Sequence, residues 1–446
     1  MRLILAVVAV FAVAVVAFFV WHHPPMRLMP APLLFQDDGT GLSGVADALV
    51  TDTRLGVFYA TSRLPVGPRE DRIYTVAPDW RLHVGTATMR IGDEGSTLDQ
   101  LREWSTQATG DRPFIHLERM AEAGTVGGDG EADWLAEIEA ALRASRSKDV
   151  VVYVHGANTT VERAAGQAAQ IRHFAGREAV VVLFAWPTAE NFLRYSRDIY
   201  NAFGAAPHLA DLVALLSENT SAERVDVFTY SAGGTVGSDA LGRLARERPE
   251  VADRVGEVYH AAPDADFRGF VADLDAYARH ARRVMAAVNL GDSALRLAGL
   301  VNPASRAGRP ALRELSPEAS EALLAAAGRD ELDIIQIRPE NMPDLPATSH
   351  TFWYDDPWVS NDMLLALLLR LSPAEAARGR RRGAGGTLLD LPARLCRAHG
   401  GGAPGARRAA RRQPRNRHGI RDRGSDRRGG VTGQGAPSRR RRAISA

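Results

Sequence analysis

Ser231 is the residue of this chain best placed for covalent chemistry. It stands in DVFTYSAGGTVG, residues 226–237, after a strand-forming run and before a cluster of glycines. A nucleophilic serine on a sharp strand-to-helix turn needs small residues two positions before and after it, because larger ones would collide at the turn. Gly233 fills the second small position, whereas Thr229 occupies the first. The motif by itself fits either a nucleophile or a structural turn.

A base is the second requirement, because a serine hydroxyl is a poor nucleophile until its proton is removed. For a serine on such a turn, the expected chain order is Ser, then Asp or Glu, then His. His350 follows the last apolar strand and lies in the loop PATSHTFWYDDP. We therefore predict that His350 is the base. The other histidines after Ser231 lie in an apolar strand, an Arg-flanked helical stretch or the C-terminal tail: His260, His280, His399 and His418.

An acid must hold the base, and two places along the chain offer one. Asp292 follows the strand RRVMAAVN. It is preferred because the acid that serves a serine on such a turn usually follows the later of the two strands. Its rivals are Asp264 and Asp266 in HAAPDAD, after the preceding strand. Asp292 also suits the N-cap of a helix, which is its alternative role.

Two backbone N–H groups are needed to stabilise the oxyanion of an acyl-transfer reaction. The residue after the nucleophile, Ala232, offers one, and the loop of VVYVHGANTT offers another at Ala157. Gly156 would let the backbone approach closely, and Asn158 could brace the loop. His155 precedes the serine and closes a strand, so we interpret it as structural.

Alternating helices and strands must position these residues. Residues 131–145 carry apolar side chains at helical spacing and lead into the apolar strand KDVVVYV. Continuous apolar strands separated by helices predict an α/β fold with a mostly parallel, doubly wound sheet. The expected helices are 160–175, 189–216, 234–247 and 316–327. The expected strands are 55–63, 81–91, 179–185, 224–229, 254–260, 283–289 and 333–337.

An uninterrupted apolar run of 19 residues, positions 3–21, opens the chain. As a helix it would match the ~30 Å hydrocarbon core of a bilayer. Because no small-residue cleavage site follows, we predict an uncleaved signal anchor over residues 1–22. A cleaved signal peptide is the alternative. Residues 23–44 are rich in Pro and Gly and are expected to be a linker to a hydrolase domain at 45–380. The expected location is a bacterial inner membrane, single-pass, with the catalytic domain facing the periplasm.

The C-terminal tail differs from the rest of the chain in composition. From Arg378 onward it holds 20 Arg and three Asp, and since the whole chain is +2 while this part is +17, the preceding residues carry −15. Residues 381–446 lack apolar clustering and are predicted to be disordered. Nucleic-acid binding is the alternative for such a tail, but an exported tail would not meet DNA, so no nucleic acid is expected. The only cysteine, Cys396, lies there, which excludes a disulfide, a Cys-based zinc site or a Cys nucleophile in the core.

Taken in order, several segments resemble the bacterial DUF900 group of α/β hydrolases over about residues 45–380. The segments are VVYVHGANTT, VVLFAWPT, TYSAGG, HAAPDAD, GDSAL and SHTFWYDDPWVSNDMLLALL. The family's HGYN and HSMG signatures correspond to residues 155–158 and 230–233, with Tyr230 in place of the usual His. The resemblance implies a Ser/Asp/His hydrolase fold but supplies no substrate.

These observations together predict a membrane-anchored serine hydrolase that cleaves an ester through Ser231, His350 and Asp292. The expected substrate is a small-molecule or lipid ester, and the expected mechanism requires no metal or organic cofactor. A peptidase, amidase or acyltransferase would use the same groups. A non-catalytic envelope scaffold on this fold is the alternative of a different class. The sequence assigns no oligomeric state.

Overall fold

The computed structural model describes residues 24–36, 47–328, 331–342 and 344–370. Within them, ten strands form one sheet. The strands are β1 (Met26–Arg27), β2 (Arg54–Val66), β3 (Ile73–Ile91), β4 (Phe114–Thr125), β5 (Asp149–Val154), β6 (Val180–Phe184), β7 (Arg224–Tyr230), β8 (Val255–Ala261), β9 (Arg283–Val288) and β10 (Leu332–Gln336). The helices are α3 (Leu98–Thr106), α4 (Glu131–Ala144), α5 (Val161–Phe174), α6 (Tyr195–Asn219), α7 (Gly233–Glu247), α8 (Pro249–Ala252), α9 (Phe267–Tyr277), α10 (Ser293–Val301), α11 (Pro317–Gly328), α12 (Phe352–Asp355) and α13 (Pro357–Leu369).

The sheet is mostly parallel, as the sequence predicts. Its order is β1-β4-β3-β2-β6-β5-β7-β8-β9-β10, and all pairs from β2/β6 to β9/β10 are parallel. The three pairs β1/β4, β4/β3 and β3/β2 are antiparallel. Strands β5 to β8 are buried at nearly every position, which explains why they read as continuous apolar runs instead of alternating ones.

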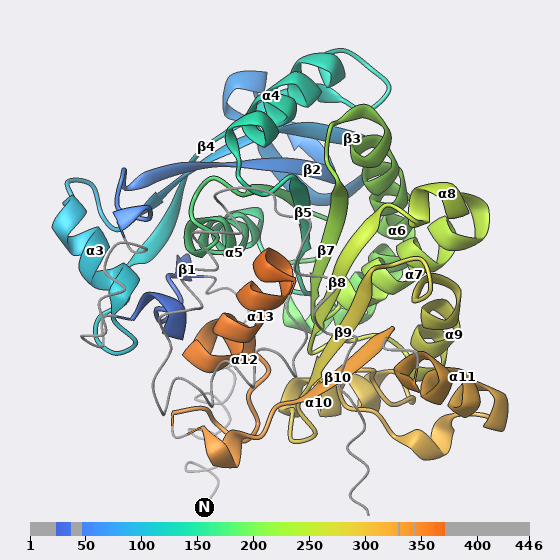
Figure 1. The fold of residues 1–446 in the computed structure, drawn as a ribbon. Helices are drawn as coiled ribbons and strands as arrows, with labels where there is room; N and C mark the ends of the chain where they lie inside the picture. The colour runs from blue at the N-terminus through green and yellow to red at the C-terminus, as the bar shows by residue number, and fades with distance from the viewer. Residues whose placement is uncertain (1–23, 37–46, 329–330, 343, 371–446) are drawn as a thin grey trace, which may run out of the picture. The chain divides into compact units, whose positions relative to one another are not determined.

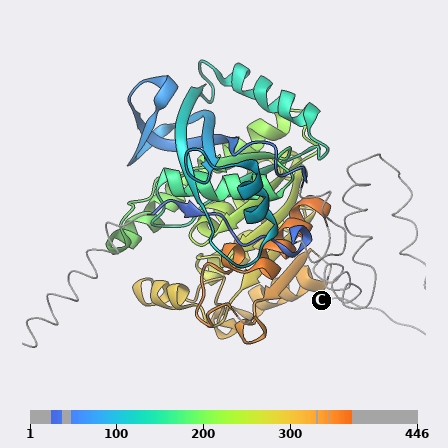
Figure 2. The same ribbon diagram turned by 90° about the vertical axis from the view of Figure 1, so that its left-hand side faces the viewer.

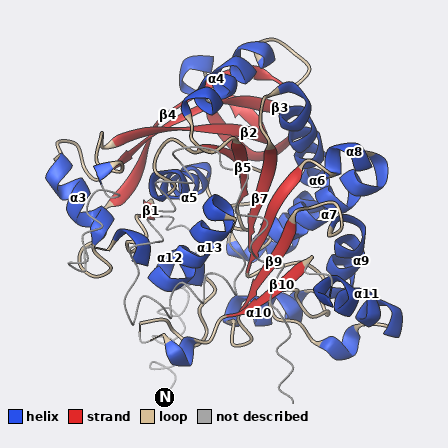
Figure 3. Cartoon of the chain, viewed as in Figure 1, coloured by secondary structure: helices blue, strands red, loops and turns tan. Residues whose placement is uncertain are grey.

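Helices cover both faces of the parallel part of the sheet (Figures 1 and 3). One apolar core joins the sheet to α5, α12 and α13, and the other joins it to α4, α6, α7 and α9. Each layer is held by large buried side chains, such as Trp353 on the first face and Trp134 on the second. The doubly wound α/β-hydrolase fold is therefore confirmed.

An antiparallel extension widens the sheet on one side. Strands β2 and β3 are much longer than the predicted 55–63 and 81–91, and their hairpin, drawn in blue, projects at the upper left of Figure 2. Strand β4 was not predicted at all. Its pairing with β3 has two register shifts, which break the alternation of apolar residues that would mark a strand.

The predicted linker over 23–44 is wrong for residues 24–36. Met26 and Arg27 form β1, Leu33–Phe35 form a 3-10 turn, and the apolar side chains between and within them are buried except for the partly buried Leu33. Met29 N–H donates to the side chain of Gln170 at 3.0 Å, which ties the segment to α5. Prolines there end regular structure without preventing apolar neighbours from packing.

Two other predictions fall on residues that the structure does not describe: the anchor over 1–22 and the tail over 381–446. In the described part, one segment, Phe192–Asn219, is long and apolar enough to cross a bilayer. More than half of its most apolar 18-residue stretch is buried, and α6 packs on α7, β7 and β2 as a core helix does.

Candidate active site

The site lies at the C-terminal ends of β5 and β7, which are neighbours in the sheet. The chain leaves β5 toward β6 on one side and later returns through α6 to β7 on the other. Where the connections after two neighbouring parallel strands lead to opposite sides, their loops separate and leave a crevice at that edge of the sheet. The loops after β5 and β7 carry His155 to Thr160 and Ser231 to Ala232.

Ser231 occupies a strained turn between β7 and α7. Its φ is 53°, in the left-handed region that residues with a side chain rarely adopt. The turn is fixed because Ser231 N–H donates to Ala261 O at 3.0 Å, and its carbonyl accepts from the N–H of Asp264 at 2.8 Å. A Cβ on Gly233 would lie 2.5 Å from Val154 O, so this glycine is required for the turn to pack against β5. These contacts aim the serine hydroxyl into the crevice.

Thr229 is tolerated in place of the expected glycine because the residue of α7 that packs against it, Gly237, has no side chain. A Cβ on Gly237 would lie 2.5 Å from the Thr229 methyl group. The Thr229 hydroxyl and His260 Nδ1 are 2.7 Å apart, and His260 is fully buried. The threonine is thus accommodated by its surroundings and leaves the turn intact.

The structure brings the three predicted catalytic side chains together. His350 Nε2 lies 2.8 Å from Ser231 Oγ, and His350 Nδ1 lies 2.6 Å from Asp292 Oδ2. The Asp292 side chain is fully buried, whereas His350 is partly open to the crevice. A hydroxyl, an imidazole and a carboxylate in this row are the arrangement that activates a serine. Their catalytic roles stay predictions.

Asp292 has both of the roles that the sequence allowed. Its second carboxylate oxygen, Oδ1, accepts a hydrogen bond from Leu295 N–H at 2.9 Å and caps α10. The cap fixes the carboxylate while leaving Oδ2 for His350. The N-cap geometry therefore orients the acid and does not compete with it.

The histidine loop is held from β9 and from β7. Asn289, directly after β9, donates through Nδ2 to Ser349 O at 2.7 Å and accepts from Gly291 N–H at 2.9 Å. The Tyr230 ring packs against the His350 ring with centroids 5.3 Å apart. Asn289 was not predicted, although an amide residue between a strand and the predicted acid was a usable signal.

The loop after β5 reaches the serine closely. A Cβ on Gly156 would lie 2.9 Å from Ser231 Cβ, so glycine is needed there. Ala232 is buried beside Ser231, and Ala157 lines the same cavity. In the described part of the chain, neither Ala157 N–H nor Ala232 N–H has a recorded acceptor. Both are free to donate to an oxyanion.

Asp198 braces this loop, a role that was predicted for Asn158. The Asp198 carboxylate accepts from Asn158 N–H at 2.8 Å and from Ala189 N–H at 2.6 Å. Burial raises the pKa of Asp198, while these two N–H groups oppose the rise. Asn158 itself adopts a φ of 51° and lines the cavity. An acid in the first turn of α6 carried no sequence signal for a contact with residue 158.

The rival acids are occupied elsewhere. Asp264 accepts from Arg306 Nε at 2.5 Å and from the Tyr195 hydroxyl at 2.7 Å. Burial and then the Asp264 charge raise the pKa of Tyr195, which keeps it a neutral donor. Asp266 caps α9 by accepting from Gly269 N–H at 3.0 Å. The contact with His350 therefore falls to Asp292.

His155 is packed as a structural residue. Its ring stacks on Trp186 with centroids 5.4 Å apart, and its Nδ1 lies 2.8 Å from Gly156 O. Burial, followed by the nearby Arg63 charge, lowers the pKa of His155 to about 3. A neutral, stacked ring supports the backbone of the loop.

The serine opens onto a cavity of about 400 Å³. Its lining is mainly apolar and includes polar groups from Ser231, His350, Asp264 and Asn158. The other lining residues are Ala157, Phe192, Leu193, Tyr195, Ser196, Tyr230, Ala294, Leu295, Leu297, Ala298 and Val301. Such a cavity suits an apolar group attached to a polar reacting centre.

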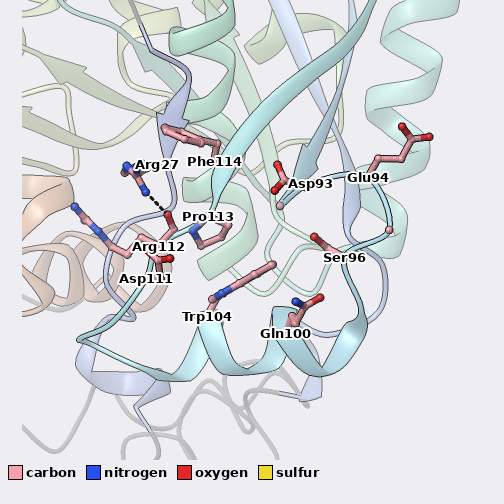
Figure 4. Close-up of a pocket in the computed structure, with 12 residues that line it drawn as sticks. Arg27, Asp93, Glu94, Ser96, Gln100, Trp104, Asp111, Arg112, Pro113 and Phe114 are labelled. Carbon is pink, nitrogen blue, oxygen red and sulfur yellow. Dashed lines mark hydrogen bonds between the residues drawn. The ribbon is translucent and has the colours of Figure 1, made fainter.

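A second cavity, of about 450 Å³, lies on the antiparallel extension and shares no lining residue with the first (Figure 4). Arg27, Arg112, Asp93, Glu94 and Asp111 give it mixed charge. The Arg27 guanidinium lies 4.1 Å from the centroid of the Phe114 ring and donates to Arg112 O at 2.7 Å. Among the described residues, its lining holds neither a histidine nor a cysteine.

Metal ligands do not gather in the described ranges. Among residues 24–36, 47–328, 331–342 and 344–370, no group of three or more His, Cys, Asp or Glu could hold an ion.

Comparison with protein-family models supports the hydrolase fold. Residues 131–350 match the family model described as an alpha/beta hydrolase of unknown function (DUF900), which confirms the resemblance over that range. No curated protein matches the sequence. One similar solved structure is lipase B of Aspergillus fumigatus, with 16% identity and a TM-score of 0.32; the match covers 52% of this chain and 54% of the lipase. Another is a thermophilic esterase from the planctomycete Thermogutta terrifontis, with 12% identity, a TM-score of 0.31 and coverage of 52% and 85%.

Proposed function

We propose that this chain, whose residues 131–350 match the DUF900 family model of alpha/beta hydrolases, is a serine hydrolase that cleaves carboxylic esters. The observation that carries the proposal is the row of Ser231, His350 and Asp292, with separations of 2.8 Å and 2.6 Å; Ser231 and His350 line a mainly apolar cavity. Ester cleavage is favoured because the cavity offers apolar surface for an acyl group and few groups that would bind a peptide backbone.

The mechanism follows from the geometry. His350 Nε2 takes the proton of the Ser231 hydroxyl as Oγ attacks the ester carbonyl, and Asp292 stabilises the imidazolium that forms. The N–H groups of Ala157 and Ala232 donate to the oxyanion of the tetrahedral intermediate. His350 then protonates the leaving alcohol, which departs and leaves an acyl group on Ser231. A water molecule, deprotonated by His350, attacks this acyl-enzyme and releases the carboxylic acid.

A fluorophosphonate probe tests the nucleophile, because it labels only an activated serine. We expect labelling of the wild-type protein and none of Ser231→Ala. Ser196→Ala is a matched control, because Ser196 lines the same cavity without a recorded contact to His350. Labelling that persists in Ser231→Ala would refute the assignment. A folded wild-type protein that takes no label would favour a scaffold.

We also propose that the chain is held in a bacterial inner membrane by the apolar run 3–21, with the hydrolase domain in the periplasm. Protease added to spheroplasts should degrade the domain, and alkaline carbonate should leave the chain in the membrane fraction. A chain that carbonate extracts, or that protease cannot reach, would contradict this placement.

A further inference from the structure

The mouth of the Ser231 cavity carries exposed apolar side chains. Phe192 and Leu193 come from the turn before α6, and Leu297 and Val301 come from α10; all four line the cavity. Together with Leu300 they are between 42% and 77% exposed. We call these five residues the apolar rim. Exposed apolar groups clustered at one opening mark a surface that meets another apolar phase.

Helix α10 turns an apolar face outward. Leu295 and Ala298 pack inward, whereas Leu297, Leu300 and Val301 are exposed and share the opposite face at helical spacing. A helix on the surface of a soluble domain normally shows charged residues there. The helix has one exposed charge, Arg296, and it is positive.

Three exposed arginines lie close in sequence to the rim residues. Arg194 and Arg197 follow Phe192 and Leu193, and Arg296 precedes Leu297. None of the three has a recorded salt bridge within the described residues, although the chain before residue 378 is net acidic. Arg197 Cζ lies 5.9 Å from the centroid of the Tyr200 ring. Apolar residues interleaved with arginines that form no salt bridge suit an interface with anionic lipid headgroups.

The chain enters the folded domain close to this site. Pro24 lines one cavity with Thr351, the residue after His350, and with Tyr354. Arg163 donates to Pro24 O at 3.3 Å. The Tyr354 ring packs on Tyr230, which in turn packs on His350. The apolar run ends at Trp21, so only two residues separate it from Pro24, a reach of about 10 Å at most.

We infer that the apolar rim docks onto the anionic bilayer in which the run 3–21 is anchored, and that Ser231 draws its substrates, carboxylic esters with long acyl chains, from that bilayer. The inference rests on the proposed function and narrows its substrate class. The acyl group passes from the lipid ester to Ser231 Oγ as the lipid alcohol leaves with a proton from His350. Water then releases the fatty acid.

Depth-dependent quenching tests docking without using activity. The full chain carrying Cys396→Ser is given one cysteine by Leu300→Cys, labelled with the fluorophore NBD, and reconstituted in vesicles of phosphatidylethanolamine and phosphatidylglycerol. Doxyl-labelled lipids should quench this label at least two-fold. Ile73→Cys is the matched control, because Ile73 is 66% exposed on the β2–β3 hairpin, at the upper end of Figure 1, opposite α10. Equal quenching at both positions, or none at 300, would overturn docking.

Two esters with the same leaving group test the substrate class. Leu300 lies outside the cavity lining, so Leu300→Glu should leave hydrolysis of water-soluble p-nitrophenyl butyrate within two-fold of wild type. Hydrolysis of p-nitrophenyl palmitate embedded in the vesicles should fall at least ten-fold, and Ile73→Glu should change neither. An equal loss on both esters, or no loss on palmitate, would overturn the inference. Failure of the proposed function would instead appear as a wild-type protein that takes no fluorophosphonate while the label at 300 is still quenched.

Discussion

Replacing Asp292 by Asn removes the charge of the proposed acid while preserving its cap on α10. Asp292 Oδ1 accepts from Leu295 N–H at 2.9 Å, and asparagine is an equally good N-cap, so the stability of the fold should change little. Oδ2 lies 2.6 Å from His350 Nδ1, which places the charge centres of a carboxylate and an imidazolium roughly 4 Å apart. At an effective dielectric of about 20, that pair is worth ~4 kcal/mol, or about 10³-fold in rate.

The assay is steady-state hydrolysis of p-nitrophenyl butyrate, together with a thermal melt of each variant. We expect Asp292→Asn to lower kcat by about 10³-fold with little change in KM and a nearly unchanged Tm. Asp264→Asn should instead lower Tm with a small effect on kcat, because it leaves the buried Arg306 guanidinium without its carboxylate. Breaking such a pair costs about 3–5 kcal/mol of stability, while kcat should fall less than ten-fold. A large loss of kcat at Asp264 and a small one at Asp292 would refute the assignment of the acid.

Two further perturbations have opposite expected directions. Gly156→Ala places a Cβ 2.9 Å from Ser231 Cβ and should lower kcat at least 10²-fold. Gly204→Ala in α6 meets no atom within 4 Å, so it should leave kcat unchanged and raise the free energy of unfolding by about 0.5–1 kcal/mol. Equal activity of the two variants would contradict the close approach of the loop after β5 to Ser231. Burial, followed by the nearby Asp149 charge, raises the pKa of Asp226 well above its ordinary value. The folded state therefore holds a proton that the unfolded state loses above pH ~4. As a result, Asp226 lowers the free energy of unfolding increasingly as the pH rises. Asp226→Asn should therefore raise Tm more at pH 8 than at pH 5, and a larger gain at pH 5 would contradict the direction of the shift.

Much of the architecture was predictable because it depends on local patterns. The parallel strands are buried on both faces, so β5 to β8 appear as apolar runs between amphipathic helices. The antiparallel extension was harder. Register shifts between β3 and β4 interrupt the two-residue period, and β4 escaped prediction. Residues 24–36 look like a linker by composition, yet Met26 and Leu28 are buried against the rest of the fold.

Some residues of the candidate site were predictable from local sequence patterns, and others were not. Ser231, Ala157 and Ala232 could be named because each lies directly after a strand, and parallel strands deliver their C-terminal ends to one edge of the sheet. The supporting residues could not. Asp198 holds the loop after β5 from the start of α6, and Arg306 occupies Asp264 from a loop beyond α10. Neither contact follows from spacing along the chain.

By itself, the sequence determined the doubly wound sheet, the serine turn after β7 and the short list of groups able to act with that serine. The tertiary structure decided which carboxylate stands beside His350, because Asp264 and Asp292 follow adjacent strands and only their partners distinguish them. Arg306 and Tyr195 surround the first, whereas the second caps α10 with one oxygen and leaves the other for the imidazole. Local patterns set where a chain can bend and what it exposes, but the pairing of charges depends on which distant segments fold against each other.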